Sequence, residues 1–294
     1  MTGIAAVAQP FGRDIEETFT RIEHTLAGAR SQGAQLVVFP ECAIGGYMRQ
    51  PGDGQAGPEL PEPLDPDGPE IRRLIALAGD TTVCIGYTEA GSGAGAGGPY
   101  SSAVCVTGDG VLGRHRKVHL PPAERFAYTA GERFAAFDTP VGRVGMLLCY
   151  DKLFPEATRA LVLDGAQIVA CMAAWRMDRH HPATTAPLDR QTRHFSTVAA
   201  ARAVENQVVW VSSNQTGEWG SLRFLGHAQI VDPDGIVRAR TTDEEGVAVA
   251  HIDAAAEIEA MRIFIDHLAD RRPAAYAFYA DSQATNDASV GVFG

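Results

Sequence analysis

Three reactive side chains stand where apolar strands of this sequence come to an end: Glu41, Lys117 and Cys149. Cys149 follows the apolar run 144–148 and precedes Pro155, which opens a helical pattern, so the thiol falls at a strand-to-helix corner. A side chain held rigidly at such a corner can face a cleft, which suits a nucleophile. Because buried charges are costly unless they are paired, we expect Glu41 and Lys117 to contact each other or a substrate.

Each of the three residues also has an ordinary structural explanation. Glu41 can be a loop carboxylate, Lys117 a solvated residue at a strand edge, and Cys149 a small apolar filler of the core. For each residue taken singly the ordinary explanation is favoured. Only the presence of all three residue types on one α/β frame favours catalysis.

Histidines supply the other candidate chemistry. His115 and His119 are four residues apart, so they share one face of a strand, and His180 and His181 are adjacent. The pattern contains no evident third ligand, so we expect ordinary loop or surface histidines and no metal site. We expect His119 to steady the loop after Lys117.

The elements that must position these residues alternate between strand and helix. A strand at 4–8, an amphipathic helix at 15–29 and a buried strand at 35–39 form an opening βαβ unit. The phrase GAQLV at 33–37 is echoed by GAQIV at 165–169, each time after a helix and before a strand. We therefore expect two related halves, packed as two sheets with helices outside. Further strands are expected at 81–87, 102–107, 134–137, 144–148, 167–170, 208–212, 226–231, 236–240 and 247–252, and further helices at 71–78, 155–163 and 188–206. The strand at 102–107 is expected to form a hairpin, across Asp109-Gly110, with another strand that reaches towards Arg116-Lys117.

Composition excludes several kinds of partner. The net charge is −11 and no basic stripe occurs, which disfavours a nucleic-acid partner. There is no leader-like segment and no long apolar run, so we expect no membrane association. Five cysteines without a CxxC pair favour a reducing, cytoplasmic location. At 294 residues, the chain is expected to form a single domain over 1–270, with a polar tail at 271–294.

The strand-end residues lie in a longer ordered series of motifs, in which each piece alone is a weak signal. The whole series resembles the nitrilase, or carbon-nitrogen hydrolase, superfamily, and it spans nearly all of the chain. It comprises Phe39-Pro40-Glu41, Arg116-Lys117-Val118-His119-Leu120, Leu148-Cys149-Tyr150-Asp151, Phe154-Pro155-Glu156, Gly165-Ala166, Ala201-Arg202-Ala203-Val204-Glu205-Asn206 and Asp232-Pro233-Asp234-Gly235.

This resemblance implies an α/β fold, a four-layer αββα sandwich whose subunits pair into a homodimer or a higher homo-oligomer. The tail at 271–294 would then pack on the dimer partner or be partly disordered. The resemblance also implies a Glu-Lys-Cys triad in which Glu41 is the general base, Lys117 the oxyanion stabiliser and Cys149 the nucleophile. A second glutamate of the amidase-like branch matches Glu124, with Glu132 close by as the alternative.

The implied chemistry is consistent with the residue types. A thiol is mostly protonated near neutral pH, so Glu41 must take its proton, while the positive charge of Lys117 stabilises the thiolate. Lys117 and the backbone N–H of Tyr150 can then hold the oxygen that becomes negative. Attack leaves a thioester on Cys149, which water hydrolyses by the reverse route, and the reaction requires no metal or organic cofactor.

Four residues are candidates for binding the substrate. Besides Tyr150, we expect Trp175 to form a wall of the acyl pocket, although a core position is the alternative. Lys152 and Arg176 are candidate partners for a substrate carboxylate.

The function favoured by these observations is hydrolysis of a small linear amide or N-carbamoyl compound with release of ammonia. A nitrilase acting on a small nitrile would share the triad, and Glu124 tilts the choice towards amides. A non-catalytic binding protein of the same fold is a further alternative, although it would be expected to lack a catalytic residue. An N-acyltransferase would be expected to carry a membrane segment, which the sequence does not show.

Overall fold

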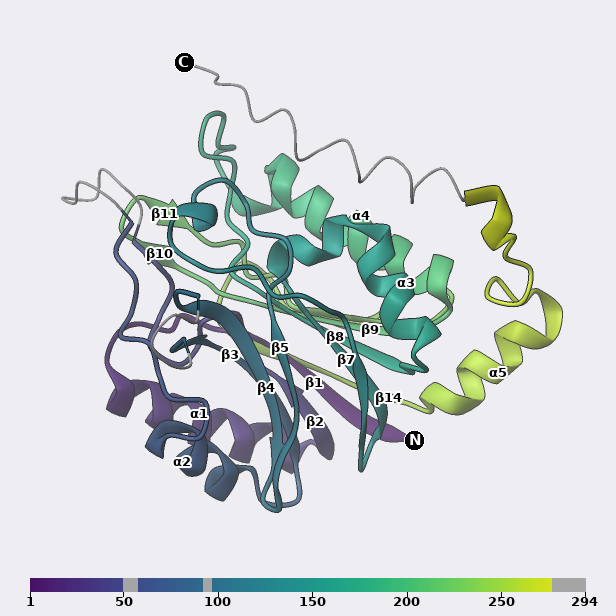
Figure 1. The fold of residues 1–294 in the computed structure, drawn as a ribbon, viewed down its shortest axis with the longest axis horizontal. Coiled ribbons are helices and arrows are strands. Elements are labelled where there is room, and N and C mark those ends of the chain that lie inside the picture. Colours follow the sequence, from purple (N-terminus) through teal and green to yellow (C-terminus); the bar gives the residue numbers. More distant parts are fainter. Residues whose placement is uncertain (50–57, 92–96, 277–294) are drawn as a thin grey trace.

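The structure, a computed structural model, describes residues 1–49, 58–91 and 97–276. Its main sheet is twelve-stranded and is folded into two layers (Figure 1). The layers are joined where Ala8, the last residue of β1 (Thr2–Ala8), pairs with Asn214, the last residue of β9 (Val209–Asn214). Because this is the one residue pair between the two strands, the sheet bends sharply there.

Each layer has three parallel strands at its centre and antiparallel strands beside them. The first layer runs β5-β4-β3-β2-β1-β14 and the second runs β6-β7-β8-β9-β12-β13. The remaining strands of the first layer are β2 (Ala34–Val38), β3 (Thr82–Glu89), β4 (Tyr100–Thr107), β5 (Gly110–Arg116) and β14 (Gly246–Ile252). Those of the second are β6 (Ala136–Thr139), β7 (Gly142–Leu148), β8 (Ile168–Ala173), β12 (Gln229–Val231) and β13 (Val237–Arg240). A separate hairpin pairs β10 (Glu218–Trp219) with β11 (Leu222–Arg223).

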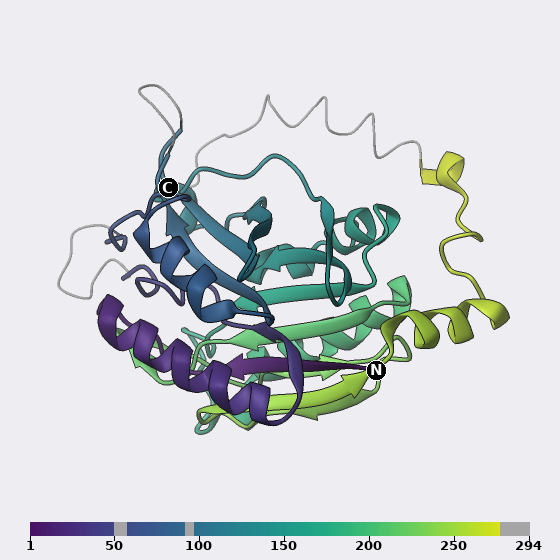
Figure 2. The same ribbon diagram turned by 90° about the horizontal axis from the view of Figure 1, so that it is seen from below.

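Helices cover the outer face of both layers (Figures 1 and 2). The first layer is covered by α1 (Ile15–Ser31) and α2 (Pro69–Ala78), and the second by α3 (Pro155–Leu163) and α4 (Arg190–Asn206). The βαβ crossovers β1-α1-β2 and β7-α3-β8 repeat the same arrangement in the two halves. The predicted pair of related halves and the four-layer αββα sandwich are therefore confirmed.

Successive side chains of a buried strand point to opposite faces of the sheet, and this alternation creates the layers of the core. In β1, Ile4, Ala6 and Ala8 face the second sheet, whereas Ala5 and Val7 pack with α1 and α2. Every one of these residues is fully buried. A strand that is buried on both faces reads as a continuous apolar run, which is why the sequence revealed these strands so clearly.

The C-terminal part differs from the sequence-based expectation. Helix α5 (Ala254–Phe264) was not predicted, and it projects from the edge of the sandwich (Figure 1). Its last turn exposes Ile263 and Phe264. Of the predicted tail, residues 271–276 include a short 3-10 turn, Pro273–Tyr276, while 277–294 lie outside the described residues. In the described part of the chain, no helix combines the length and hydrophobicity that a membrane crossing needs.

Candidate active site

The loop after β2 carries Glu41 to the seam between the two sheets. Hydrogen bonds from the second sheet hold this loop: Ser213 Oγ donates to the Phe39 carbonyl over 2.7 Å, and Gln215 Nε2 donates to the Glu41 carbonyl over 3.0 Å. The Glu41 side chain is completely buried, and its Oε2 accepts from the backbone N–H of Ala174 over 3.1 Å. The carboxylate is thus fixed before any substrate arrives.

Lys117, the first residue after β5, lies between two carboxylates. Its Nζ donates to Glu41 Oε1 over 2.8 Å and to both oxygens of Glu124, over 2.9 Å and 2.7 Å. Glu41 Oε1 also accepts from Ser101 Oγ over 3.2 Å. All three ionisable groups are buried. The expected contact between Glu41 and Lys117 is therefore present.

The carboxylates of Glu41 and Glu124 keep Lys117 protonated. Burial lowers the pKa of Lys117, but the neighbouring Glu124 and Glu41 carboxylates outweigh it and hold the pKa well above its usual value. Burial raises the pKa of Glu124, while Lys117 opposes that rise. Lys117 is therefore a permanent ammonium near neutral pH.

The second glutamate in this cluster is Glu124 and not Glu132. Glu124 opens a short 3-10 turn, Glu124–Phe126, and its Oε1 also accepts from the Tyr47 hydroxyl over 2.7 Å. Glu132 is exposed and lines a different pocket, on the side of Arg114 and Arg116. Of the two glutamates, Glu124 is therefore the one that contacts Lys117.

Cys149 occupies the turn between β7 and α3, as predicted. It begins a 3-10 turn, Cys149–Leu153, and has φ of 47°, a left-handed conformation that costs a residue with a side chain roughly 1–3 kcal/mol. The residue is 8% exposed. Burial, followed by the charge of Glu41, raises the pKa of the thiol well above its ordinary value, and Lys117 opposes the rise. Cys149 is thus a protonated thiol before reaction, and a base must remove its proton before the sulfur can act as a nucleophile.

Asp151 connects the cysteine turn to the loop that follows Lys117. Its Oδ1 accepts from the backbone N–H of His119 over 2.8 Å and lies 2.9 Å from His119 Nδ1, while Oδ2 lies 3.1 Å from His115 Nε2. Burial alone would raise the pKa of Asp151, but these contacts lower it to about 2. His119 steadies this loop, as the sequence predicted, and it does so through an aspartate from another element.

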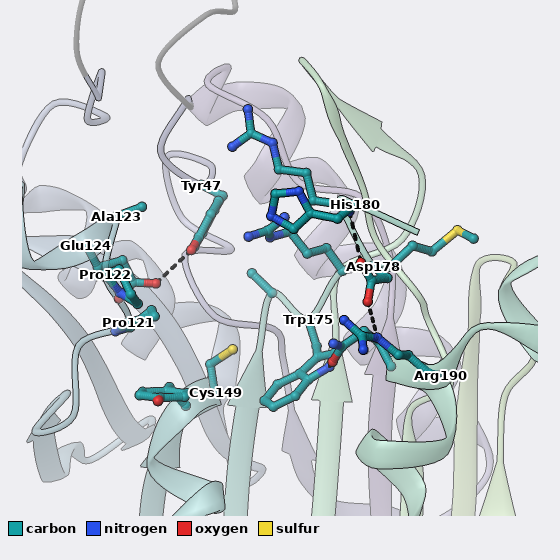
Figure 3. Close-up of a pocket in the computed structure, with 16 residues that line it drawn as sticks. Tyr47, Pro121, Pro122, Ala123, Glu124, Cys149, Trp175, Asp178, His180 and Arg190 are labelled. Atoms are coloured by element: carbon teal, nitrogen blue, oxygen red, sulfur yellow. Dashed lines mark hydrogen bonds and ion pairs between the residues drawn. The ribbon is translucent and has the colours of Figure 1, made fainter. Parts of the chain in front are cut away.

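A pocket of about 370 Å³ opens above Cys149 (Figure 3). In the figure, the Cys149 sulfur points into the pocket, with Tyr47 and Glu124 on one side and Trp175 on the other. Glu41 and Lys117 are not among the lining residues, because they are completely buried behind this wall. The Cys149 thiol and the Glu124 carboxylate therefore line the pocket, while Glu41 and Lys117 lie behind them.

The four predicted substrate-binding residues have different positions. Tyr150, Trp175 and Arg176 line the pocket. Trp175 is held by its indole N–H, which donates to Gln191 Oε1 over 3.0 Å. Lys152 is buried outside the pocket lining, with Nζ above aromatic rings, so its position argues against contact with a substrate carboxylate.

Sequence reasoning missed three parts of this site. Tyr47, which fixes Glu124, lies in an irregular loop where a tyrosine has no distinctive spacing. The backbone N–H of Ala174, which binds Glu41, carries no side-chain signal at all. Asp151 stood in the motif beside Cys149, but its partners are more than 30 residues away, so its role was invisible without the fold.

The histidines singled out in the sequence lie in two separate places. His115 and His119 both contact Asp151, whereas His180 lies at the pocket in another loop. Among the residues that the structure describes, no group of three or more His, Cys, Asp or Glu side chains has the arrangement to hold a metal ion.

Comparisons with known proteins agree with this geometry. The family model for carbon-nitrogen hydrolase matches residues 3–262. The chain is 33% identical to a nitrilase of Pyrococcus abyssi over 81% of this chain and 84% of that protein. It is 32% identical to an (R)-stereoselective amidase of Pseudomonas sp. over 90% of both chains. A mutant of the amidase of Nesterenkonia sp. AN1, in which acrylamide has added to the active-site cysteine, superposes with a TM-score of 0.74 at 25% identity, covering 95% of this chain and all of that one.

Proposed function

Because the chain belongs to the carbon-nitrogen hydrolase family, we propose that it hydrolyses small linear amides or N-carbamoyl compounds through a thioester on Cys149, releasing ammonia. The observation that carries this proposal is the buried ammonium of Lys117, bonded to Glu41 and Glu124 behind a pocket that Cys149 lines. A base, a cation and a nucleophile are the groups that acyl transfer needs.

In the acylation step Glu41 takes the proton of Cys149 and the sulfur attacks the carbonyl carbon. The carbonyl oxygen becomes negative and is held by the Lys117 ammonium and the backbone N–H of Tyr150. The tetrahedral intermediate collapses as Glu41 returns the proton to the leaving nitrogen. The C–N bond breaks, ammonia departs, and a thioester remains.

Deacylation repeats these roles with water as the nucleophile. Glu41 takes a proton from water, the hydroxide oxygen attacks the thioester carbon, and the same donors hold the negative oxygen. Glu41 then returns the proton to the sulfur as the C–S bond breaks. The product is an acid, and the side chains return to their starting state.

Glu124 supports an amide over a nitrile. It lines the pocket as well as binding Lys117, so one of its oxygens can accept a hydrogen bond from a substrate NH₂ group. A nitrile has no hydrogen to donate. A nitrile would therefore leave this acceptor on Glu124 unused, and a nitrilase remains the second candidate.

The charge at the pocket wall favours an acyl group that carries a carboxylate. Arg176 and Arg179 line the pocket, and within the described residues neither guanidinium has an ion-pair partner. The nearby Asp178 carboxylate is already engaged by Arg190 and by the backbone N–H groups of His180 and His181. Two unpaired guanidiniums can bind a carboxylate at the far end of a short substrate.

An ammonia-release screen tests the function directly. It should include short amides, N-carbamoyl amines, N-carbamoyl amino acids and nitriles, with succinamate and butyramide as a pair that differs in the terminal carboxylate. We expect turnover of amides or carbamoyl compounds and a preference for succinamate that is lost in Arg176→Ala. Turnover of nitriles alone would support the second candidate, and equal turnover of the matched pair would remove the carboxylate preference.

A further inference from the structure

Lys117 and Lys152 are the only lysines in the chain, whose other 23 basic residues are arginines. Both lysines are completely buried. An ammonium differs from a guanidinium because it is compact and can release its proton when it is desolvated. The first lysine belongs to the charged cluster beside Cys149, whereas the mechanism assigns no part to the second.

The Lys152 ammonium lies in an aromatic corner. Its Nζ is 3.4 Å from the ring centroid of Phe195 and 4.2 Å from that of Trp175. The two rings meet edge to face, with centroids 6.2 Å apart. Among the described residues, this nitrogen has no hydrogen-bond partner. Attraction to the negative faces of the two rings is therefore the main interaction that replaces the hydration the Lys152 ammonium loses on burial.

This corner joins three parts of the active site. Lys152 follows Cys149 by three residues in a 3-10 turn, where such residues lie on the same side. Trp175 forms part of the pocket wall, and Phe195 belongs to α4. The same helix also holds the turn through Arg202, whose Nε donates to the Lys152 carbonyl over 2.8 Å.

We propose that Lys152 is a positioning residue whose ammonium, held between Trp175 and Phe195, fixes the pocket wall relative to the turn that carries Cys149. The residue acts through Trp175 and does not touch the substrate. The catalytic consequence rests on the proposed function, because it takes Cys149 as the nucleophile. The structural part of the proposal, that the Lys152 ammonium holds Trp175 in place, does not depend on any reaction.

The proposal predicts a pH dependence of the pocket. Burial lowers the pKa of Lys152 to about 8, with Cys171 of β8 and Cys149 opposing this shift and Arg202 of α4 adding to it. Above that pH the amine is neutral and the attraction to both rings weakens. Trp175 should then be held less firmly, and substrate binding should weaken between about pH 7 and pH 9.

Nuclear magnetic resonance on the unmodified protein gives the first test. Labelling with ¹³Cε-lysine should produce two signals, because the chain has two lysines. We expect one signal, shifted by aromatic ring currents, to titrate near pH 8, and the Lys117 signal to stay constant over that range. Two signals without a ring-current shift, or none that titrates below about pH 10, would overturn the proposal.

Steady-state kinetics of two variants give the second test. Lys152→Met keeps the length and apolar stem but removes the charge, and we expect KM to rise roughly tenfold at pH 7 with kcat nearly unchanged. Lys152→Arg keeps a charge that stacks on aromatic rings and should restore a low KM that no longer changes between pH 7 and pH 9. A fall of kcat at constant KM in Lys152→Met would mean that the ammonium acts on the thiolate, which contradicts a positioning role.

The two tests separate this proposal from the proposed function. If no amide, carbamoyl compound or nitrile is hydrolysed, the titration and ring-current shift of Lys152 still decide whether the ammonium lies in the aromatic corner. If the protein is an active amidase and Lys152→Met has wild-type KM at every pH, the function stands and the proposal fails. The fold of Lys152→Met is checked by its melting temperature, since replacement of an isolated buried charge need not destabilise a protein.

Discussion

Tyr47 donates its phenolic hydrogen to the same Glu124 oxygen that accepts a hydrogen bond from Lys117. The two donors approach from different elements, and the second Glu124 oxygen accepts from Lys117 as well. Glu124 is thus surrounded by donors that only a carboxylate, with two accepting oxygens, can satisfy together.

Replacement of Glu124 by glutamine should therefore disturb the site despite its equal size. The amide presents one oxygen and one NH₂ group, so a donor must face Lys117 or Tyr47. We expect amide turnover to fall about 100-fold, because Lys117 and the substrate both lose their positions. The matched control is Glu132→Gln, which changes an exposed residue and should leave turnover near the wild-type rate. The reverse pattern would mean that Glu132 is the second catalytic glutamate.

Lys117→Ala should lower kcat much more than it raises KM. The variant loses the cation that holds the oxyanion, which costs roughly 3 kcal/mol or more of transition-state stabilisation. It also leaves two buried carboxylates facing each other. Arg114→Ala, which breaks a surface ion pair with Asp67, is the control for a charge removed from β5, the strand that Lys117 follows. A raised KM at normal kcat would identify Lys117 as a binding residue.

Cys149→Ala should abolish ammonia release and leave the far-ultraviolet circular dichroism spectrum unchanged. Removing the sulfur removes the nucleophile, while the turn keeps its backbone hydrogen bonds. Cys42→Ala is a suitable control, because Cys42 is also buried, adjoins Glu41 and has a positive φ. We expect that control to retain most activity. Residual turnover in Cys149→Ala above the background of a mock preparation would contradict the thioester mechanism.

Asp151 should make stability depend on pH in the acid range. Its folded-state pKa of about 2 is below the ordinary value of 3.8, so its contribution is complete only above about pH 5. That contribution is lost as the pH falls towards 2, and it amounts to about 2 kcal/mol. Thermal unfolding of wild type and Asp151→Asn between pH 6 and pH 2.5 measures it. The difference in unfolding free energy should shrink with falling pH, and a constant difference would show that Asp151 is not ionised in its contacts.

The family resemblance predicts a homodimer or a multiple of it, and light scattering at micromolar concentration can test this. Exposed apolar residues at the end of α5, Ile263 and Phe264, are costly in water and suit a protein contact. We expect a mass near twice the 31.3 kDa of the chain, and a shift towards the monomer in the double variant Ile263→Ser, Phe264→Ser. A monomeric wild type would contradict the prediction.

The sequence predicted the parts of the site that depend on residue type at strand ends. Glu41 and Cys149 could be found because apolar runs stop shortly before them. Lys117 follows the polar end of β5, Arg114-His115-Arg116, so it was identified by its motif at 116–120, and the fold then brings it into contact with Glu41. The doubly buried strands were visible for the same reason, since they contain almost no polar residue.

Contacts between distant loops could not be predicted in the same way. Asp151 meets His115 and His119 only when the two sheets face each other, and the support of Glu124 by Tyr47 depends on the same packing. Helix α5 was missed because it buries only Ala254 and Ile258, which is too few positions to give a clear helical period. Lys152 was assigned to substrate because a charged side chain beside a nucleophile suggests a ligand, and its aromatic surroundings come from α4 and the β8–α4 loop.

The pairing of β1 has a consequence for the order in which the chain acquires structure during synthesis. β1 can pair with β2 soon after both leave the ribosome, but its antiparallel neighbour, β14, is synthesised about 240 residues later. At roughly 5–20 residues per second, the outer edge of β1 waits for tens of seconds without its partner. During that time the unpaired N–H and C=O groups along this edge can pair with another chain, which makes the nascent protein prone to aggregation.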